Sequence, residues 1–186
     1  KKCEVVDDHA TCIPETTRCW ASGGPHYHTF DGKSFDFMGT CTYVLTKSCD
    51  PDPNLPIFSI EVQKEDRDNP QLSPVGSVTV HVYDLTVVVV RLEKGFVRVN
   101  NLRSRLPISL ADGKLHLQQK GKFLQLQTSF HLKVLYDWAD HVVVTLPRTF
   151  SGKVCGLCGN SNGDPRDDAL KPDGQLVQDL VELGQS

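Results

Sequence analysis

The sequence has no long apolar run and no block of basic residues. Its 186 residues include 20 Lys or Arg and 23 Asp or Glu, which give a formal net charge of −3. Because the basic residues are scattered along the chain, we expect no binding to nucleic acid. The longest apolar run, residues 86–92, has the length of a strand and falls short of the about 20 residues that span a bilayer. We therefore expect no membrane insertion.

Cysteine is missing from the middle of the chain. Of the seven cysteines, five lie within residues 3–49, and the other two are Cys155 and Cys158. This segregation indicates disulfides that join the two ends of the chain, and it favours an oxidising, extracellular compartment. The odd number leaves at least one cysteine unpaired, which we attribute to truncation. The N-terminal "KKCEVVDD" also has no apolar signal-peptide segment, so we expect the chain to be a part of a longer secreted protein.

Helical periodicity is missing before residue 170. In its place, about ten or more short runs of β-branched and aromatic residues alternate with polar residues between Gly, Asp and Asn turns. This pattern predicts an all-β fold, an antiparallel β-sandwich. Asp31-Gly32 predicts a hairpin turn, and a second pair of strands should divide near Asp84. Only residues 174–184, with apolar residues on one side and Gly184 as a C-cap, predict a short helix.

The stretch "VCGLCGNSNGDPRDD", residues 154–168, combines two kinds of candidate chemistry. Its Cys155-x-x-Cys158 pair suits redox catalysis in a strand–helix context, but here a strand precedes it and a polar loop follows. A zinc site would need a second pair of ligands at matching spacing, and none is apparent. Disulfides to the N-terminal cysteines are the simpler interpretation, although the spacing leaves the pairing open.

The loop after Cys158 is rich in hard oxygen ligands. Asn160, Asn162 and Asp164 alternate, Gly163 permits a tight turn, and two further aspartates follow. Calcium prefers six to eight such oxygens. The loop lacks the closing glutamate and the preceding helix of an EF-hand. Because Asn, Asp and Gly are also the default turn residues, a calcium site and a solvated acidic turn remain equally open on the residues alone.

Two motifs together resemble one family. "GGPHYHTFDGKSFDFMGTCTYVL" (residues 23–45) and the stretch at 154–168 resemble the von Willebrand factor type D domain, in wording most similar to the branch found in the IgG-Fc-binding mucus protein and zonadhesin. The resemblance covers roughly residues 19–186. Residues 1–18 resemble the end of the small cysteine-rich module that precedes such domains. The resemblance implies a disulfide-stapled, calcium-binding β-sandwich with a C-terminal calcium loop.

The resemblance also implies site residues. Calcium would be held by the carboxylate of Asp31 and by the loop after "CGLC", through the side chains of Asn160, Asn162, Asp167 and Asp168 and the backbone carbonyl of Asp164. The implied disulfides are Cys19–Cys158, Cys49–Cys155 and Cys3–Cys12. Cys41 would pair with a cysteine of the following module, which would explain the odd number.

One departure from the family pattern concerns backbone cleavage. Many relatives carry G-D-P-H, in which the aspartate carboxylate attacks its own carbonyl carbon and expels the proline nitrogen, leaving an anhydride. This chain has "GGPH", with Gly24 before Pro25. Glycine has no carboxylate, so we expect neither self-cleavage nor the crosslinking that an anhydride permits. We interpret His26 as a structural residue.

These features favour a non-enzymatic structural or interaction module of a large secreted mucus or matrix glycoprotein with repeated D domains. Expected partners are neighbouring modules of the same chain, with mucins or other secreted glycoproteins as further candidates. No catalytic constellation such as a nucleophile elbow or a phosphate-binding loop is apparent. The alternatives are a specific ligand-binding or cell-adhesion domain, of the immunoglobulin Fc or egg-coat type, and a self-processing or thiol-exchange domain that uses "CGLC".

Overall fold

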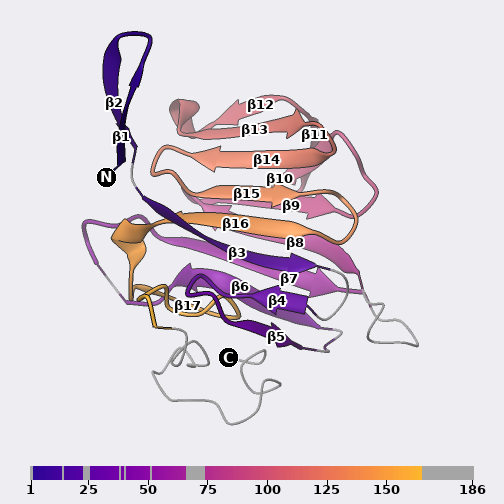
Figure 1. Cartoon of the computed structure of the whole chain (residues 1–186). Coiled ribbons are helices and arrows are strands. Elements are labelled where there is room, and N and C mark those ends of the chain that lie inside the picture. The colour runs from indigo at the N-terminus through magenta and orange to yellow at the C-terminus, as the bar shows by residue number, and fades with distance from the viewer. Residues whose placement is uncertain are drawn as a thin grey trace.

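The chain folds into two antiparallel β-sheets that lie face to face around a shared core, with a separate N-terminal hairpin (Figure 1). The structure is a computed structural model, and it describes residues 2–13, 15–22, 26–37, 39, 41–50, 52–65 and 74–164. The predicted all-β, antiparallel fold class is confirmed. The predicted helix at residues 174–184 lies outside the described residues.

The first sheet has seven strands in the spatial order β11-β10-β9-β8-β7-β6-β17. Strands β6 to β11 form a meander, and β17 returns from the far end of the sequence to pair with β6. The bounds are β6 Thr42–Ser48, β7 Phe58–Lys64, β8 Val75–Val82, β9 Leu85–Val90, β10 Phe96–Val99, β11 Leu102–Arg105 and β17 Val154–Cys155.

The second sheet has eight strands in the order β12-β13-β14-β15-β16-β3-β4-β5. Its bounds are β12 Ile108–Leu110, β13 Leu115–Lys120, β14 Phe123–Thr128, β15 Lys133–Tyr136, β16 Val142–Pro147, β3 Thr16–Ser22, β4 His26–His28 and β5 Ser34–Asp36. The remaining elements are the hairpin β1 Lys2–Val6 and β2 His9–Ile13 and the 3-10 turns η2 Ala111–Gly113 and η3 Arg148–Phe150. None of the described residues form a helix with the length and apolar character that a bilayer crossing requires.

Alternation along each strand places one set of side chains in the core. In β7, Phe58, Ile60 and Val62 are each at most 2% exposed, while the residues between them face solvent at least in part. Burial of such side chains contributes about 1.5–3 kcal/mol each. The core is thus formed by the inward-facing side chains of the two sheets. This explains why apolar residues recur at every second position of the sequence.

One hydrogen bond joins the two sheets across the core. The hydroxyl of Tyr136, on β15, donates to the carbonyl oxygen of Val75, on β8, at 2.5 Å, and Tyr136 is fully buried. Burial raises the pKa of the Tyr136 phenol, with a smaller contribution from the nearby Asp137 charge. The phenol therefore stays protonated and remains a donor over the physiological pH range.

The sequence predicted two turns correctly but missed several strands, β3 among them. The hairpin at Asp31-Gly32 joins β4 to β5, and Tyr83-Asp84 joins β8 to β9, as expected. Strand β3 was not among the predicted strands, yet it pairs with β16 on one side and β4 on the other. Its sequence, "TTRCWAS", is polar and contains a cysteine, so its buried residues Cys19 and Ala21 gave little hydrophobic signal.

We expect Tyr136→Phe to lower the free energy of unfolding by about 1–3 kcal/mol, because it leaves the buried carbonyl of Val75 without this donor. Tyr83→Phe is the matched control, since its hydroxyl contacts Ser129 Oγ at 2.6 Å in an exposed position where water can replace it. Urea unfolding of the full chain measures both. Equal losses in the two variants would contradict a stabilising role for the link between the sheets.

Candidate functional site

The "CGLC" segment connects the two sheets through its two cysteines. Cys155, in β17, is bonded to Cys49, which directly follows β6 of the seven-stranded sheet. Cys158 is bonded to Cys19, in β3 of the eight-stranded sheet. The two disulfides thus leave the same four-residue segment toward opposite layers. These are two of the three pairs that the family resemblance implies, and the third, Cys3–Cys12, closes the N-terminal hairpin.

The residues between the two cysteines fit against an irregularity in β6. The pairing of β6 with β7 shifts register between Val44 and Thr46. The amides of Leu157 and Cys158 donate to the carbonyl oxygens of Val44 and Leu45, at 3.1 and 2.9 Å. This close approach requires glycine at position 156, where a Cβ atom would lie 2.8 Å from the Leu45 oxygen and φ is +112°.

Thiol chemistry at this segment would therefore need reduction first. Cys155 and Cys158 are each bonded to a distant cysteine, and both are buried. Among the described residues, Cys41 is the free cysteine, and it is exposed. The arrangement differs from a redox C-x-x-C motif, in which the two sulfurs bond to each other.

The turn after β4 places Asp31 against the acidic loop. Thr29 fixes the turn, because its amide donates to the Lys33 carbonyl at 2.8 Å and its hydroxyl accepts from the Lys33 amide at 3.0 Å. The amide of Phe30 donates to the carbonyl of Cys158 at 3.0 Å, which ties the turn to the second disulfide. Asp31 is thereby held next to the residues that follow "CGLC".

Asp31 contacts that loop directly. Its two carboxylate oxygens accept from the amide of Asn162 at 3.1 Å and from the amide of Gly163 at 2.7 Å, across more than 130 residues of sequence. Within the loop, the side-chain oxygen of Asn160 accepts from the Asn162 amide at 3.3 Å, and that of Asn162 accepts from the Asp164 amide at 2.8 Å. The structure thus brings together four of the six predicted ligands. Asp167 and Asp168 lie outside the described residues.

The oxygens gathered here suit a hard cation. Each carboxylate or amide oxygen that accepts one N–H retains a second lone pair, which a calcium ion can use. In the described part of the chain, no group of three or more His, Cys, Asp or Glu side chains is placed so that it could hold a metal ion. A complete calcium site would therefore depend on Asn160 and Asn162, on backbone carbonyls and on Asp167 and Asp168.

A histidine–aspartate pair follows the Gly24-Pro25 sequence. Gly24 and Pro25 lie outside the described residues. The next residue, His26, starts β4, and its Nδ1 lies 2.8 Å from a carboxylate oxygen of Asp36 on β5. Both side chains are exposed, so the pair contributes little to stability.

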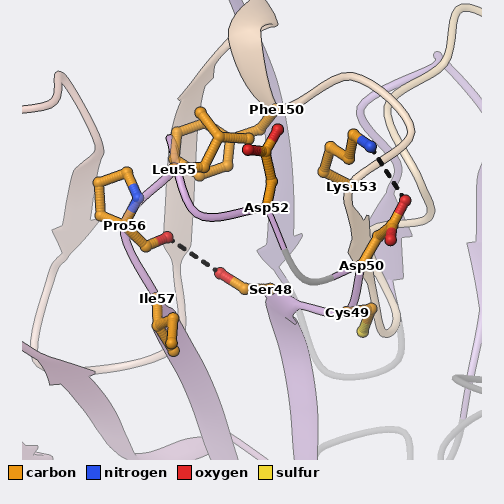
Figure 2. A pocket seen from close by; sticks show the side chains of 9 residues that line it. All are labelled: Ser48, Cys49, Asp50, Asp52, Leu55, Pro56, Ile57, Phe150 and Lys153. Atoms are coloured by element: carbon orange, nitrogen blue, oxygen red, sulfur yellow. Dashed lines mark hydrogen bonds and ion pairs between the residues drawn. The ribbon is translucent and has the colours of Figure 1, made fainter.

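A small hollow of about 140 Å³ lies beside the Cys49–Cys155 disulfide (Figure 2). Lys153 and Asp50 close one side through an ion pair at 3.0 Å, and the hydrogen bond and charge of Asp50 raise the pKa of the Lys153 ammonium. The Ser48 hydroxyl donates to the carbonyl of Pro56 at 3.3 Å and accepts from the Phe58 amide at 3.1 Å. Among the described residues that line the hollow, the Ser48 hydroxyl is thus engaged by the backbone, and no histidine is present to activate it.

One buried lysine was not predicted from the sequence. Lys64, the last residue of β7, is only 2% exposed and lies with its ammonium 5.7 Å from the ring centre of Tyr27. Burial lowers the pKa of Lys64, and the charge of Asp140 partly opposes this shift. The burial of Lys64 could have been predicted from the sequence, because the residue continues the alternation that places Phe58, Ile60 and Val62 in the core.

We expect the double variant Cys19→Ala/Cys158→Ala to lose about 4–5 kcal/mol of unfolding free energy, because the bond closes a chain separation of 139 residues. The control Cys3→Ala/Cys12→Ala opens a separation of 9 residues in the exposed hairpin, and it should cost about 2.5 kcal/mol. Urea unfolding under non-reducing conditions measures both. A loss no greater than that of the control would contradict the cross-sheet role of Cys158.

The sequence comparisons agree with this architecture. The family profile described as von Willebrand factor type D domain matches residues 19–175. The human protein named IgGFc-binding protein is 48% identical over 100% of this chain, which covers 4% of that protein. Mouse alpha-tectorin is 37% identical over 99% of the chain and 9% of its own length. Human zonadhesin is 41% identical over 89% of the chain and 6% of its own length.

The chain therefore spans less than a tenth of the length of each of these relatives. The profile match covers most of the chain, including β3, both sheets and the "CGLC" segment. On this basis, the chain belongs to the von Willebrand factor type D domain family.

Proposed function

We propose that the chain is a non-enzymatic, extracellular structural or interaction module of a large secreted glycoprotein of the mucus or matrix type, with neighbouring D modules as its first partners. The observation that carries the proposal is that the "CGLC" cysteines and Asp31 both make bonds that hold the fold together. Cys155 is bonded to Cys49, beside one sheet, and Cys158 is bonded to Cys19, in the other sheet. Asp31 is hydrogen-bonded to the acidic loop. The groups best suited to chemistry are thus engaged in holding the fold.

An extracellular location is supported by the three disulfides, which persist in oxidising compartments. The exposed, free Cys41 fits the same proposal. In a longer chain it can bond to a cysteine of the following module and so fix the angle between two modules. The thiol-exchange alternative is weakened, because neither Cys155 nor Cys158 is a free thiol.

Calcium completes the proposal. Bound to Asp31, Asn160, Asn162, Asp164, Asp167 and Asp168, the ion would neutralise carboxylates that otherwise repel one another. Asp31 contributes from the β4–β5 turn, and the other residues follow β17. A cation shared by the two segments would therefore stabilise the same junction that Cys158 closes, and it would favour the folded state because the unfolded chain cannot present these oxygens together.

We expect calcium to raise the melting temperature of the full chain. A ligand at a hundred times its Kd adds about 2.7 kcal/mol, which corresponds to a shift of about 5–10 °C for a domain of this size. Asp31→Asn should abolish most of the calcium-dependent increment, since the amide keeps an acceptor oxygen but loses the charge. Thermal melts with excess calcium and with a chelator provide the measurement.

Asp36→Asn is the matched control, because Asp36 is an exposed carboxylate on the same hairpin that pairs with His26 and not with the loop. It should retain the full calcium increment. No difference between calcium and chelator in the wild-type chain would refute calcium binding. An equal increment in the Asp31 variant would place the ion elsewhere.

We also expect the chain to stay intact at the Gly24–Pro25 bond, because position 24 has no carboxylate. Gly24→Asp restores the attacking group, and we expect that variant to cleave into fragments of 24 and 162 residues. The fragments should separate only on a reducing gel, because Cys19–Cys158 joins them. Gly24→Ala is the control. Cleavage of the wild-type chain, or equal cleavage of the alanine variant, would overturn the carboxylate mechanism.

A further inference from the structure

Positive charge is concentrated in one part of the fold. Residues 91–122 contain eight Lys or Arg and two Asp or Glu, whereas the whole chain has 20 and 23. This segment forms strands β10 to β13. Among them, β11 is an edge strand of the seven-stranded sheet, and β12 is an edge strand of the eight-stranded sheet. They lie at one end of the sandwich, and β4, β5 and β17 lie at the other (Figure 1). The basic end is therefore remote from the acidic loop.

Three arginines share the outer face of the β10–β11 hairpin. Phe96 lies opposite Arg105, and Arg98 lies opposite Arg103. Directly opposed residues of an antiparallel pair project to the same side of the sheet. The Arg103 guanidinium lies 3.9 Å from the centre of the Phe96 ring, and that of Arg105 lies 5.5 Å from it. Phe96 thus holds two guanidinium groups close together on an exposed surface.

This arrangement is unfavourable for the isolated domain. Like charges directly opposite one another destabilise a sheet, and Arg98 faces Arg103 in this way. Arg98 has a carboxylate partner, Glu93, at 2.7 Å. Within the described part of the chain, no carboxylate lies in ion-pair distance of Arg103 or Arg105. Charged side chains often protect an edge strand from pairing with another chain, but Arg98 lies on β10, which has a partner on both sides. Edge protection therefore does not account for all three arginines.

We propose that the outer face of β10–β11, formed by Arg98, Arg103, Arg105 and the stacked Phe96, binds a sulfated polysaccharide. Guanidinium groups donate paired N–H bonds that match sulfate and carboxylate oxygens. Arg103 and Arg105 are about 7 Å apart along the strand, and Arg98 lies about 5 Å across from Arg103. A linear polymer with repeated anionic groups can contact all three.

Two arguments favour a sulfated polysaccharide over nucleic acid: the contacts of Phe96 and the proposed extracellular location of the chain. Single-stranded nucleic acid binds through bases stacked on free aromatic rings, whereas the Phe96 ring is covered by a guanidinium. The inference rests on the proposed extracellular location, where sulfated polysaccharides are abundant polyanions. The sequence did not predict this surface, because the three arginines become neighbours only through the cross-strand register.

Heparin of defined length is the probe, titrated by calorimetry against the full chain with calcium present at about 0.15 M salt. Arg103→Gln/Arg105→Gln should weaken heparin binding about tenfold or more, because two charge-assisted contacts are lost. By analogy with counterion release from DNA, the slope of log affinity against log salt should also fall by about two. The conservative pair Arg103→Lys/Arg105→Lys should lose less, because it retains the charge.

The matched control is Arg18→Gln/Lys133→Gln, which removes two exposed cations from the outer face of the other sheet. It should bind heparin as the wild type does. The proposal is overturned if the wild type does not bind, if both double variants lose affinity equally, or if desulfated heparin binds equally well. Competition by polyglutamate at equal charge concentration would assign the face to an acidic peptide instead. Calcium-dependent melting of each variant tests the calcium proposal separately.

Discussion

The fold depends on two cysteines, three positions apart, that are bonded to different layers. Cys155 reaches the seven-stranded sheet through Cys49, and Cys158 reaches the eight-stranded sheet through Cys19. Between these two cysteines the chain leaves β17 and enters a turn. Gly156 permits that turn, and the carbonyls of Val44 and Leu45 anchor it. Gly156 and the two cysteines of "CGLC" therefore each have a structural explanation.

The proposed calcium ion and the second disulfide act on the same junction. The Phe30 amide is bonded to the carbonyl of Cys158, and the adjacent Asp31 accepts from the loop four and five residues further on. Covalent closure brings Asp31 to the loop, and the amides orient its two oxygens. The disulfide therefore removes much of the entropic cost of assembling an ion site from segments more than 130 residues apart. In return, a cation bound by both segments would stabilise the junction that the disulfide closes.

Sequence reasoning succeeded where a local rule decides the structure. Strict alternation predicted the antiparallel strands, as in Phe58, Ile60 and Val62, and the Asp-Gly pair predicted the β4–β5 turn. It failed where the decisive contacts are tertiary. Strand β3 is polar and is ordered by its neighbours β16 and β4, and Arg98 and Arg103 become neighbours only through the hairpin register. Likewise, the meeting of Asp31 with residues 160–164 came from family resemblance, because spacing cannot specify a contact over such a separation.

The two ends of the sandwich have different physical roles. At the β4, β5 and β17 end, disulfides and the hydrogen bonds of Asp31 hold together segments that are distant in the sequence. At the β11 and β12 end, three arginines and an aromatic ring are directed outward, with fewer carboxylates than cations. The Glu93 carboxylate offsets the charge of Arg98 only, and an anion from outside the domain would relieve the remaining repulsion between the guanidinium groups. Recognition of an anionic partner is therefore to be sought on the β10–β11 face, where the charges are unbalanced, and not at Cys155 and Cys158, which are already bonded.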